Sequence, residues 1–156
     1  MYERILVAID GGDAARAALG EAIELARSLD ARLRLVHVIN QTPWAASGVT
    51  GETLQQLLDG LRGTGESLVH EALAAARGAR VQTDSRLVEA PGAAAGEYVI
   101  KEASAWPANL IVCGTQGRRG MRRLVMGSDA EYILRHSPVP VLLRRAPEAV
   151  ERREPR

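Results

Sequence analysis

Three short runs of apolar residues are spaced along the chain. They cover residues 4–9 and 109–113, and residues 32–39, which alternate at their start and are apolar at their end; polar or glycine residues follow each of them. Continuous apolar runs of this length are typical of parallel strands that are buried on both faces of a sheet. The sequence therefore predicts three inner strands, the first of which delivers Asp10 to its carboxyl end.

Between these strands, apolar residues recur at helical spacing. The spacing predicts helices over residues 13–29, 51–77, 93–103 and 128–136, with Asp13 as a cap of the first. The second helix contains Gly60, Gly63 and Gly65, each of which costs up to about 1 kcal/mol relative to alanine, so a kinked or frayed middle is expected. Residues 40–50 are expected to form a flap over the carboxyl ends of the strands.

Two further strands have the pattern of sheet edges. Residues 81–88 alternate between polar and apolar side chains, which suits an edge. Residues 137–144 are mostly apolar, but Pro138 and Pro140 remove two backbone donors, so this strand can be fully paired on one side at most. An edge left open can pair with a strand of a second chain.

Five strands alternating with four helices predict an α/β fold, a single doubly wound parallel sheet with helices on both faces. Such sheets bind ligands beyond the carboxyl ends of their strands, where the strand order reverses. Asp10, Val38 and Gly114 lie at this rim in three different strands. We expect one domain over residues 1–145 and a disordered charged tail over residues 146–156.

Composition narrows the possible functions. The 156 residues carry a formal net charge of +1, which argues against binding of nucleic acid by the whole surface. No apolar run reaches the length of a membrane span, and the first residues lack the apolar core of a signal peptide. Cys113 is the only cysteine, which excludes an internal disulfide and fits a reduced compartment. We therefore expect a cytoplasmic protein without a membrane partner.

Residues 113–135 have the features of an anion site. Gly114 and Gly117 follow an apolar strand, and neither has a side chain that would keep a ligand from the backbone. Gly127 and Ser128 precede the last helix, so its first peptide N–H groups should face the same space. The alternative is a tight loop between strand and helix in which Ser128 is only an N-cap.

Four arginines lie between Gly117 and Gly127, at positions 118, 119, 122 and 123. They can form a solvated loop or a clamp on a phosphate group. Only one or two side chains of such a loop can face a ligand, and Arg118 and Arg122 are the candidates.

The spacing Gly114-x2-Gly117-x9-Gly127-Ser128 resembles the G-x2-G-x9-G-[S/T] motif of the ATP-binding universal stress proteins. The residues Val-Ala-Ile-Asp10-Gly and Ser137-Pro-Val-Pro-Val-Leu-Leu are similar to the two ends of that family. The resemblance implies a Rossmann-like sheet of order 3-2-1-4-5 and a site for ATP, ADP or AMP. It also implies a homodimer that pairs through residues 139–144.

Carried over to this sequence, the resemblance implies a role for each matching position. Asp10 would lie near the adenine or ribose, and the backbone of Val38 would contact the base. The first two motif glycines would lie along the ribose and phosphates, and the last glycine with its serine would hold phosphate oxygens. The complete implied set is Ala8, Ile9, Asp10, Val38, Gly114, Thr115, Gly117, Arg118, Met126, Gly127, Ser128, Asp129 and Ala130.

Three positions depart from the family pattern. Asp10 is followed by two glycines rather than Gly-Ser, and Gln116 stands where a histidine is common. Asp129 follows Ser128 where a small or apolar residue is usual. A carboxylate about 4 Å from a terminal phosphate would repel it by roughly 4 kcal/mol at an effective dielectric of 20, favouring ADP unless Mg²⁺ or an arginine neutralises the charge. Asp129 can equally be a first-turn acid that points to solvent.

Other nucleotide motifs and catalytic groups are missing from the sequence. It contains no G-x4-G-K-[S/T], and no G-x-G-x-x-G follows the first strand. No nucleophile stands beside a base, so no catalytic residue is assigned. His37 is expected in the core, and His70 and His136 lack metal-ligand spacing, so no metal site is predicted.

The function predicted from these observations is an adenine-nucleotide-binding regulatory module of the stress response. Two alternatives remain at this point. One is slow ATP hydrolysis or phosphotransfer, with a cation at Asp10 or Asp129. The other is a nucleotide-free dimeric interaction protein whose glycine loop is only structural.

Overall fold

The computed structural model describes residues 1–116 and 125–147. Gly117 and Arg118, and the clamp candidate Arg122, lie outside the described residues. So does most of the predicted tail, residues 148–156.

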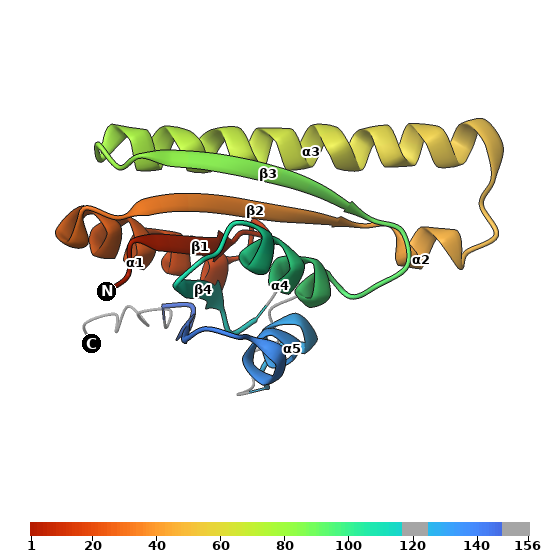
Figure 1. Cartoon of the computed structure of the whole chain (residues 1–156). Coiled ribbons are helices and arrows are strands. Elements are labelled where there is room, and N and C mark those ends of the chain that lie inside the picture. Colours follow the sequence, from red (N-terminus) through yellow and green to blue (C-terminus); the bar gives the residue numbers. More distant parts are fainter. Residues whose placement is uncertain (117–124, 148–156) are drawn as a thin grey trace, which may run out of the picture.

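A parallel five-stranded sheet of order β3-β2-β1-β4-β5 forms the centre of the protein (Figure 1). Its strands are β1 (Arg4–Ala8), β2 (Arg32–Asn40), β3 (Thr83–Ala90), β4 (Leu110–Gly114) and β5 (Val141–Arg144). The predicted doubly wound order is confirmed. The order reverses between β1 and β4, which places the ligand-binding crevice of this fold at their carboxyl ends.

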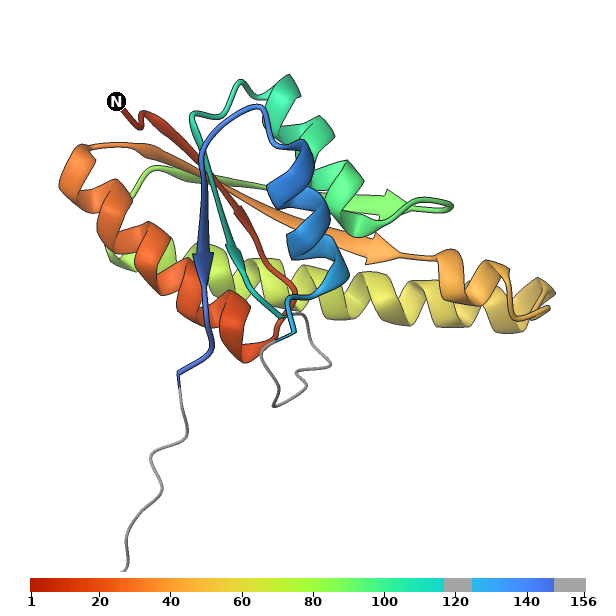
Figure 2. The ribbon, with the colours of Figure 1, turned by 90° about the horizontal axis from the view of Figure 1, so that it is seen from below.

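Helices cover both faces of the sheet. They are α1 (Asp13–Leu29), the short α2 (Thr42–Ala45), α3 (Gly51–Gly78), α4 (Ala95–Ala105) and α5 (Ser128–His136). Helices α1 and α3 lie on one face, and α4 and α5 lie on the other (Figures 1 and 2). Because α1, α4 and α5 each follow a strand, all three begin at the carboxyl edge of the sheet.

Alternate residues of each inner strand supply two separate cores. In β1, Ile5 and Val7 pack on the side of α1 and α3, whereas Leu6 packs on the side of α4 and α5. All three side chains are fully buried. A strand buried on both faces has to be apolar throughout, which explains the continuous run seen in the sequence.

The expected kink in the long helix is wrong, because α3 runs without interruption over 28 residues. Of the three glycines in the middle of α3, Gly65 has a packing role: an added Cβ would lie 2.9 Å from Cδ2 of His37 and 3.0 Å from Cδ1 of Leu87. It lets the helix approach the sheet closely. An added Cβ at Gly60 or Gly63 would meet nothing within 4 Å.

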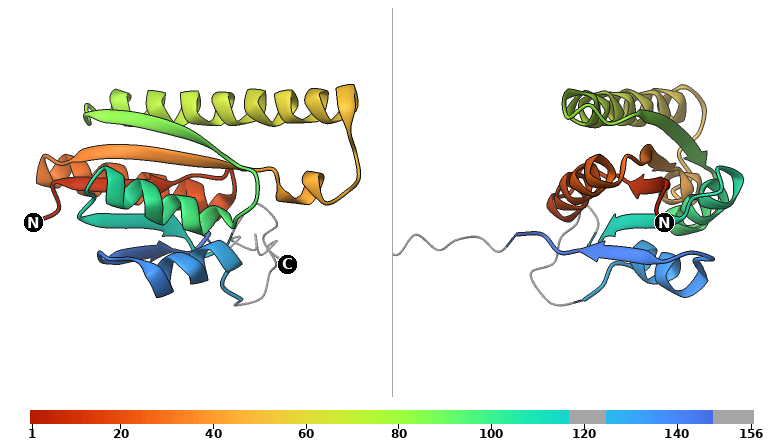
Figure 3. Two further views of the ribbon diagram at one scale, coloured as in Figure 1. Left: turned by 45° about the vertical axis from the view of Figure 1, so that its right-hand side comes forward. Right: turned by 60° about the vertical axis from the view of Figure 1, so that its left-hand side comes forward.

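The expected flap over the carboxyl ends of the strands is also wrong. Residues 40–50 contain α2, and together with the first turns of α3 they extend past the ends of β2 and β3 (Figure 3). None of them lines the pocket described below. Arg62 of α3 ties this extension to the sheet through an ion pair with Glu89 of β3.

Both predicted edge strands lie at edges, with shifted limits. Strand β3 begins and ends two residues later than expected. Strand β5 begins at Val141 rather than residue 137, so both prolines precede it. Pro140 has no N–H group, and it bonds to β4 through its carbonyl, which accepts a hydrogen bond of 3.0 Å from Ile111 N–H.

Candidate functional site

A pocket of about 380 Å³ opens at the carboxyl ends of β1 and β4. This volume falls in the range of roughly 300–1,000 Å³ that small-molecule sites occupy. Valine, isoleucine, alanine, methionine and cysteine side chains form most of the wall, and the starts of α1, α4 and α5 surround it. The pocket therefore lies where the strand order predicts a ligand site.

Ten of the thirteen predicted site residues line this pocket: Ala8, Ile9, Asp10, Val38, Gly114, Met126, Gly127, Ser128, Asp129 and Ala130. Thr115 does not line it, and its backbone instead closes the base of the loop. Gly117 and Arg118 lie outside the described residues.

The sequence did not assign nine other lining residues: Ala15, Val36, Ala95, Gly96, Val99, Cys113, Gln116, Val125 and Ile133. Strand alternation alone could have identified Val36, since it lies two residues before Val38 on the same face. Val99 and Ile133 come from α4 and α5. Their contribution depends on how these helices pack, which a motif does not record.

The backbone of Val38 faces the pocket because β2 continues past the end of β1. The last backbone bond between the two strands runs from Ile9 N–H to the Val36 carbonyl at 2.9 Å. Residues two apart on a strand point their N–H and C=O groups the same way. Val38 therefore presents a donor and an acceptor to the space beyond β1.

Asp10 is held at the opposite side of the pocket, at the start of α1. Its Oδ1 accepts a hydrogen bond of 2.8 Å from the N–H of Gly12. Gly11 has a φ of 83°, a left-handed conformation that favours glycine, which gives a physical reason for one glycine of the Gly-Gly pair. The N-cap of α1 is Gly12 rather than the predicted Asp13, which is exposed and pairs with Arg16.

Gly114 has a packing role that the motif does not reveal. An added Cβ would lie 2.7 Å from the Ala14 carbonyl carbon and 2.8 Å from the N of Ala15. No real Cβ tolerates such distances, so the first turn of α1 can lie here only against glycine. Gly114 also lines the pocket, so it serves both the packing of α1 and the approach of a ligand.

Thr115 closes the base of the loop that begins at Gly114. Its carbonyl accepts a hydrogen bond from the N–H of Gly127 at 2.7 Å, and its own N–H donates to the Arg144 carbonyl at 2.9 Å. One residue thus joins the start of the loop to its end and to the edge strand β5. Gly127 is thereby fixed in place as the N-cap residue of α5.

Helix α5 begins at the pocket, and Ser128 is its first residue. The alternative in which Ser128 is the N-cap is therefore wrong, because the N-cap is Gly127. Gly127 has no side chain that could cap this end. The first N–H groups of a helix carry a partial positive charge equivalent to roughly half an elementary charge. The start of α5 can therefore hold an anion.

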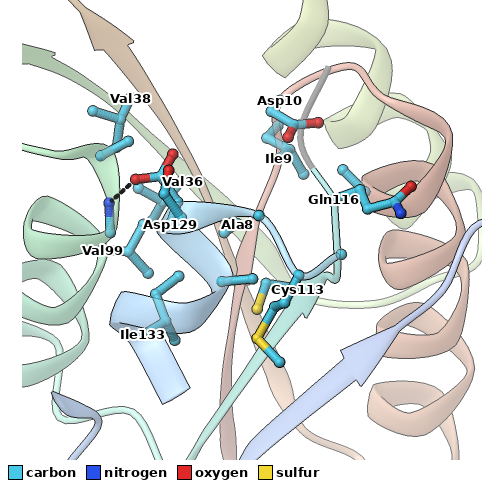
Figure 4. A pocket seen from close by; sticks show the side chains of 18 of the residues that line it. Ala8, Ile9, Asp10, Val36, Val38, Val99, Cys113, Gln116, Asp129 and Ile133 are labelled. Carbon is cyan, nitrogen blue, oxygen red and sulfur yellow. Dashed lines mark hydrogen bonds between the residues drawn. The ribbon is translucent and has the colours of Figure 1, made fainter. Parts of the chain in front are cut away.

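Asp129 contacts α4 instead of extending into solvent. Its Oδ1 accepts a hydrogen bond of 2.9 Å from the N–H of Gly96, in the first turn of α4 (Figure 4). The side chain is exposed on its other sides and lines the pocket. Its position at the rim is therefore set by a partner in another helix.

Cys113 lies at the floor of the pocket and is 4% exposed. Burial, with a smaller contribution from the charge of Asp10, raises the pKa of its thiol to about 12. A protonated thiol is neither a nucleophile nor a good metal ligand at neutral pH, so Cys113 acts as an apolar wall. His37 is half-buried and donates from Nδ1 to the Ile9 carbonyl at 2.8 Å.

Two further properties hold for residues 1–116 and 125–147. No three or more His, Cys, Asp or Glu side chains are arranged to hold a metal ion. No helix is both long and apolar enough to cross a membrane.

Comparison with known proteins agrees with this geometry. The universal stress protein family matches residues 1–145. The chain is 31% identical over 154 residues to a putative universal stress protein of Staphylococcus haemolyticus, covering 99% of this chain and 91% of the relative. The crystal structure of a family protein from Burkholderia pseudomallei is 33% identical with a TM-score of 0.73, covering 91% of this chain and 95% of that one.

More distant structures with the same fold were solved with nucleotides. A universal stress protein from Archaeoglobus fulgidus in complex with dAMP is 21% identical with a TM-score of 0.64, covering 92% of this chain and 98% of that one. A family protein from Arabidopsis thaliana with AMP bound is 14% identical with a TM-score of 0.68, covering 93% and 92%. The family match over nearly the whole chain and the shared fold lead to one conclusion: this protein belongs to the universal stress protein family.

Proposed function

We propose that the pocket binds ATP or a shorter adenine nucleotide, and that the protein is a regulatory module of the stress response that signals through the state of loop 114–127. The observation that carries the proposal is the backbone of Val38, which faces an apolar pocket at the strand-order reversal. The AMP and dAMP bound by distant members of the family support the same class of ligand.

The donor and acceptor of Val38 fit the edge of adenine. The base presents an acceptor at N1 beside a donor at its 6-amino group, so N1 can accept from the Val38 N–H while the amino group donates to the Val38 carbonyl. Val36, Val99 and Ile133 supply apolar surface for the faces of the ring. An apolar slot with a few fixed polar groups is the usual form of a site for such a ligand.

The phosphates fit the start of α5. Gly127 leaves the backbone accessible, and each favourable contact of an anion with a helix N-terminus contributes about 0.3–1 kcal/mol. Ser128 is exposed beside it and can donate its hydroxyl to a phosphate oxygen. ATP would enter with Mg²⁺ held by its own phosphates, and we assign no protein ligand to the ion.

The test is a thermal shift with ATP. We expect ATP to raise the melting temperature of the wild type, and Gly127→Val to abolish the shift by placing a branched side chain where the phosphates approach. Gly92→Val is the matched control, since an added Cβ at Gly92 would meet nothing within 4 Å and Gly92 is outside the pocket. Absence of binding to the wild type of millimolar ATP, ADP and AMP would refute the proposal and favour the nucleotide-free interaction protein.

The same sample distinguishes a binding module from an enzyme. A module returns its ATP unchanged, whereas a hydrolase releases phosphate in a reaction that requires Mg²⁺. If the protein releases phosphate and Asp129→Ala abolishes this release, the protein is a hydrolase and not a binding module.

We further propose a cytoplasmic homodimer that pairs through β5. The carbonyls of Pro140 and Arg144 accept hydrogen bonds from Ile111 of β4 and from Thr115 just after it, so the alternate residues Val141 and Leu143 point their backbone groups to the open edge. Leu143→Pro should therefore weaken the dimer by removing one outward donor while the bonds to β4 remain. Sedimentation tests this, and a wild type that stays monomeric at micromolar concentration would contradict it.

The buried, unpaired Cys113 fits the reducing cytoplasm.

A further inference from the structure

Asp129 occupies a fixed position between two helices. The hydrogen bond from Gly96 N–H to its Oδ1 joins the first turns of α4 and α5. The helices lie so close here that a Cβ on Gly96 would come within 2.9 Å of the Asp129 carbonyl and 3.1 Å of Cβ of Tyr132. A flexible surface acid would sample many positions, whereas this carboxylate is held to the wall that α4 forms.

The position is on the apolar side of the pocket. Val99 follows Gly96 by one turn of α4 and packs with Val36 and Val38 of β2. Figure 4 shows Asp129 on the same side as Val38 and Val99, with Asp10 and Gln116 on the other side. The negative charge thus lies where the proposed site receives the base, which differs from the sequence-based expectation of a carboxylate beside the terminal phosphate.

We propose that Asp129 recognises the 6-amino group of adenine and is the residue that sets base specificity. The inference rests on the proposed function. An ionised carboxylate only accepts hydrogen bonds, and the bond to Gly96 uses one of its roughly four lone-pair positions. The 6-amino group has two hydrogens. When one is donated to the Val38 carbonyl, the second is available to Asp129.

Hypoxanthine and guanine are rejected by the same pair of contacts. Both carry an oxygen at position 6, which would face a carboxylate and a carbonyl, and a hydrogen on N1, which would face the Val38 N–H. Guanine could instead offer two donors to both oxygens of a carboxylate. Oδ1 is already held by Gly96, so that two-point arrangement competes with the contact between the helices.

The experiment compares four ligands, each saturated with Mg²⁺, by calorimetry: ATP, GTP, inosine triphosphate and purine riboside 5′-triphosphate. The last has a hydrogen at position 6, so it removes the donor without adding an acceptor. Hydrogen bonds to charged groups contribute more than neutral ones, and for this exposed carboxylate we expect the wild type to bind ATP about tenfold more tightly than purine riboside triphosphate.

Asp129→Asn is the decisive variant. Its amide oxygen can still accept from Gly96, which directs its N–H₂ group toward the base. The ratio of ATP to purine riboside triphosphate affinity should fall to about one or below, a loss of about tenfold, and inosine triphosphate should gain. Glu131→Gln removes the same charge from the first turn of α5 but lies outside the pocket, and should leave the ratio unchanged.

The outcomes separate this inference from the proposed function. If the wild type binds ATP but the ratio is the same in Asp129→Asn, the proposed function stands and the role of Asp129 is refuted. Tighter binding of GTP than of ATP would also refute it, because the carboxylate would then recognise guanine. If neither the triphosphates nor ADP and AMP bind the wild type, both proposals fail together.

Discussion

The first turn of α1 approaches Gly114 so closely that a Cβ on this residue would lie 2.8 Å from the Cβ of Ala14. The first glycine of the motif is thus required by the packing of the protein itself, whether or not a ligand is bound. Gly114 is the last residue of the inner strand β4, and it is where this strand contacts the first turn of α1.

Replacing Gly114 by alanine should therefore destabilise the folded protein without any ligand. Overpacking of a tight core site costs about 1–3 kcal/mol, because the neighbouring backbone has to shift. The measurement is urea denaturation of the ligand-free protein. Gly92→Ala is the control, since its Cβ would enter open space and the free energy of unfolding should stay within about 0.5 kcal/mol of the wild type. Equal stability of the two variants would contradict the packing role.

The contact between Asp129 and Gly96 should stabilise α4 as a cap supplied by another helix. Asp129→Ala leaves the Gly96 N–H without its side-chain acceptor, and loss of a cap costs about 0.5–2 kcal/mol. Asp129→Asn keeps an acceptor and should lose less. Hydrogen exchange of the first turn of α4 is the specific readout, and unchanged protection in Asp129→Ala would show that the bond contributes nothing.

The ion pair between Arg62 and Glu89 should make the extension formed by α2 and the start of α3 sensitive to acid. The hydrogen bond from Arg62 lowers the pKa of Glu89. A carboxyl whose folded pKa is depressed stabilises the protein above its unfolded value of about 4.3, and this contribution is lost as the pH falls through the folded pKa.

The corresponding test follows proteolysis of residues 40–50 as a function of pH with an acid-stable protease. Cleavage in the wild type should increase below about pH 4, the region where unpaired glutamates titrate. Glu89→Gln should already be cleaved faster at pH 6 and change less on acidification. Identical pH profiles would mean that the pair does not hold the extension.

Cys113 should be inert in the folded protein. Its thiol keeps its proton to a pKa of about 12, and thiol reagents react with the thiolate. Alkylation at pH 8 should therefore be slow in the native state and complete within minutes in denaturant. Rapid native labelling would show that the pocket floor opens.

The raised pKa of the Cys113 thiol also affects the stability of the protein at high pH. An unfolded cysteine ionises near pH 8.5, whereas the folded thiol remains neutral. The stabilising contribution is complete below that value and is lost as the pH rises toward 12, so Cys113→Ala should show a weaker loss of stability above pH 9 than the wild type.

The sequence by itself determined the order of the elements and the edge of the sheet that carries the pocket. Apolar runs such as residues 4–9 have to be buried on both faces, and strands separated by helices produce a parallel sheet. The spacing from Gly114 to Gly127 was enough to identify the family. Each of these properties is local or periodic, so it is readable from one chain.

Only the tertiary structure decided which groups meet. That Gly114 contacts Ala14, that Gly65 admits His37, and that Asp129 is held by Gly96 all depend on distances between elements far apart in the sequence. A helix N-terminus attracts an acid in general, but which helix an exposed aspartate caps depends on how two helices pack. Because of this packing, the Asp129 carboxylate lies on the apolar side of the pocket and not on the phosphate side that the sequence suggested.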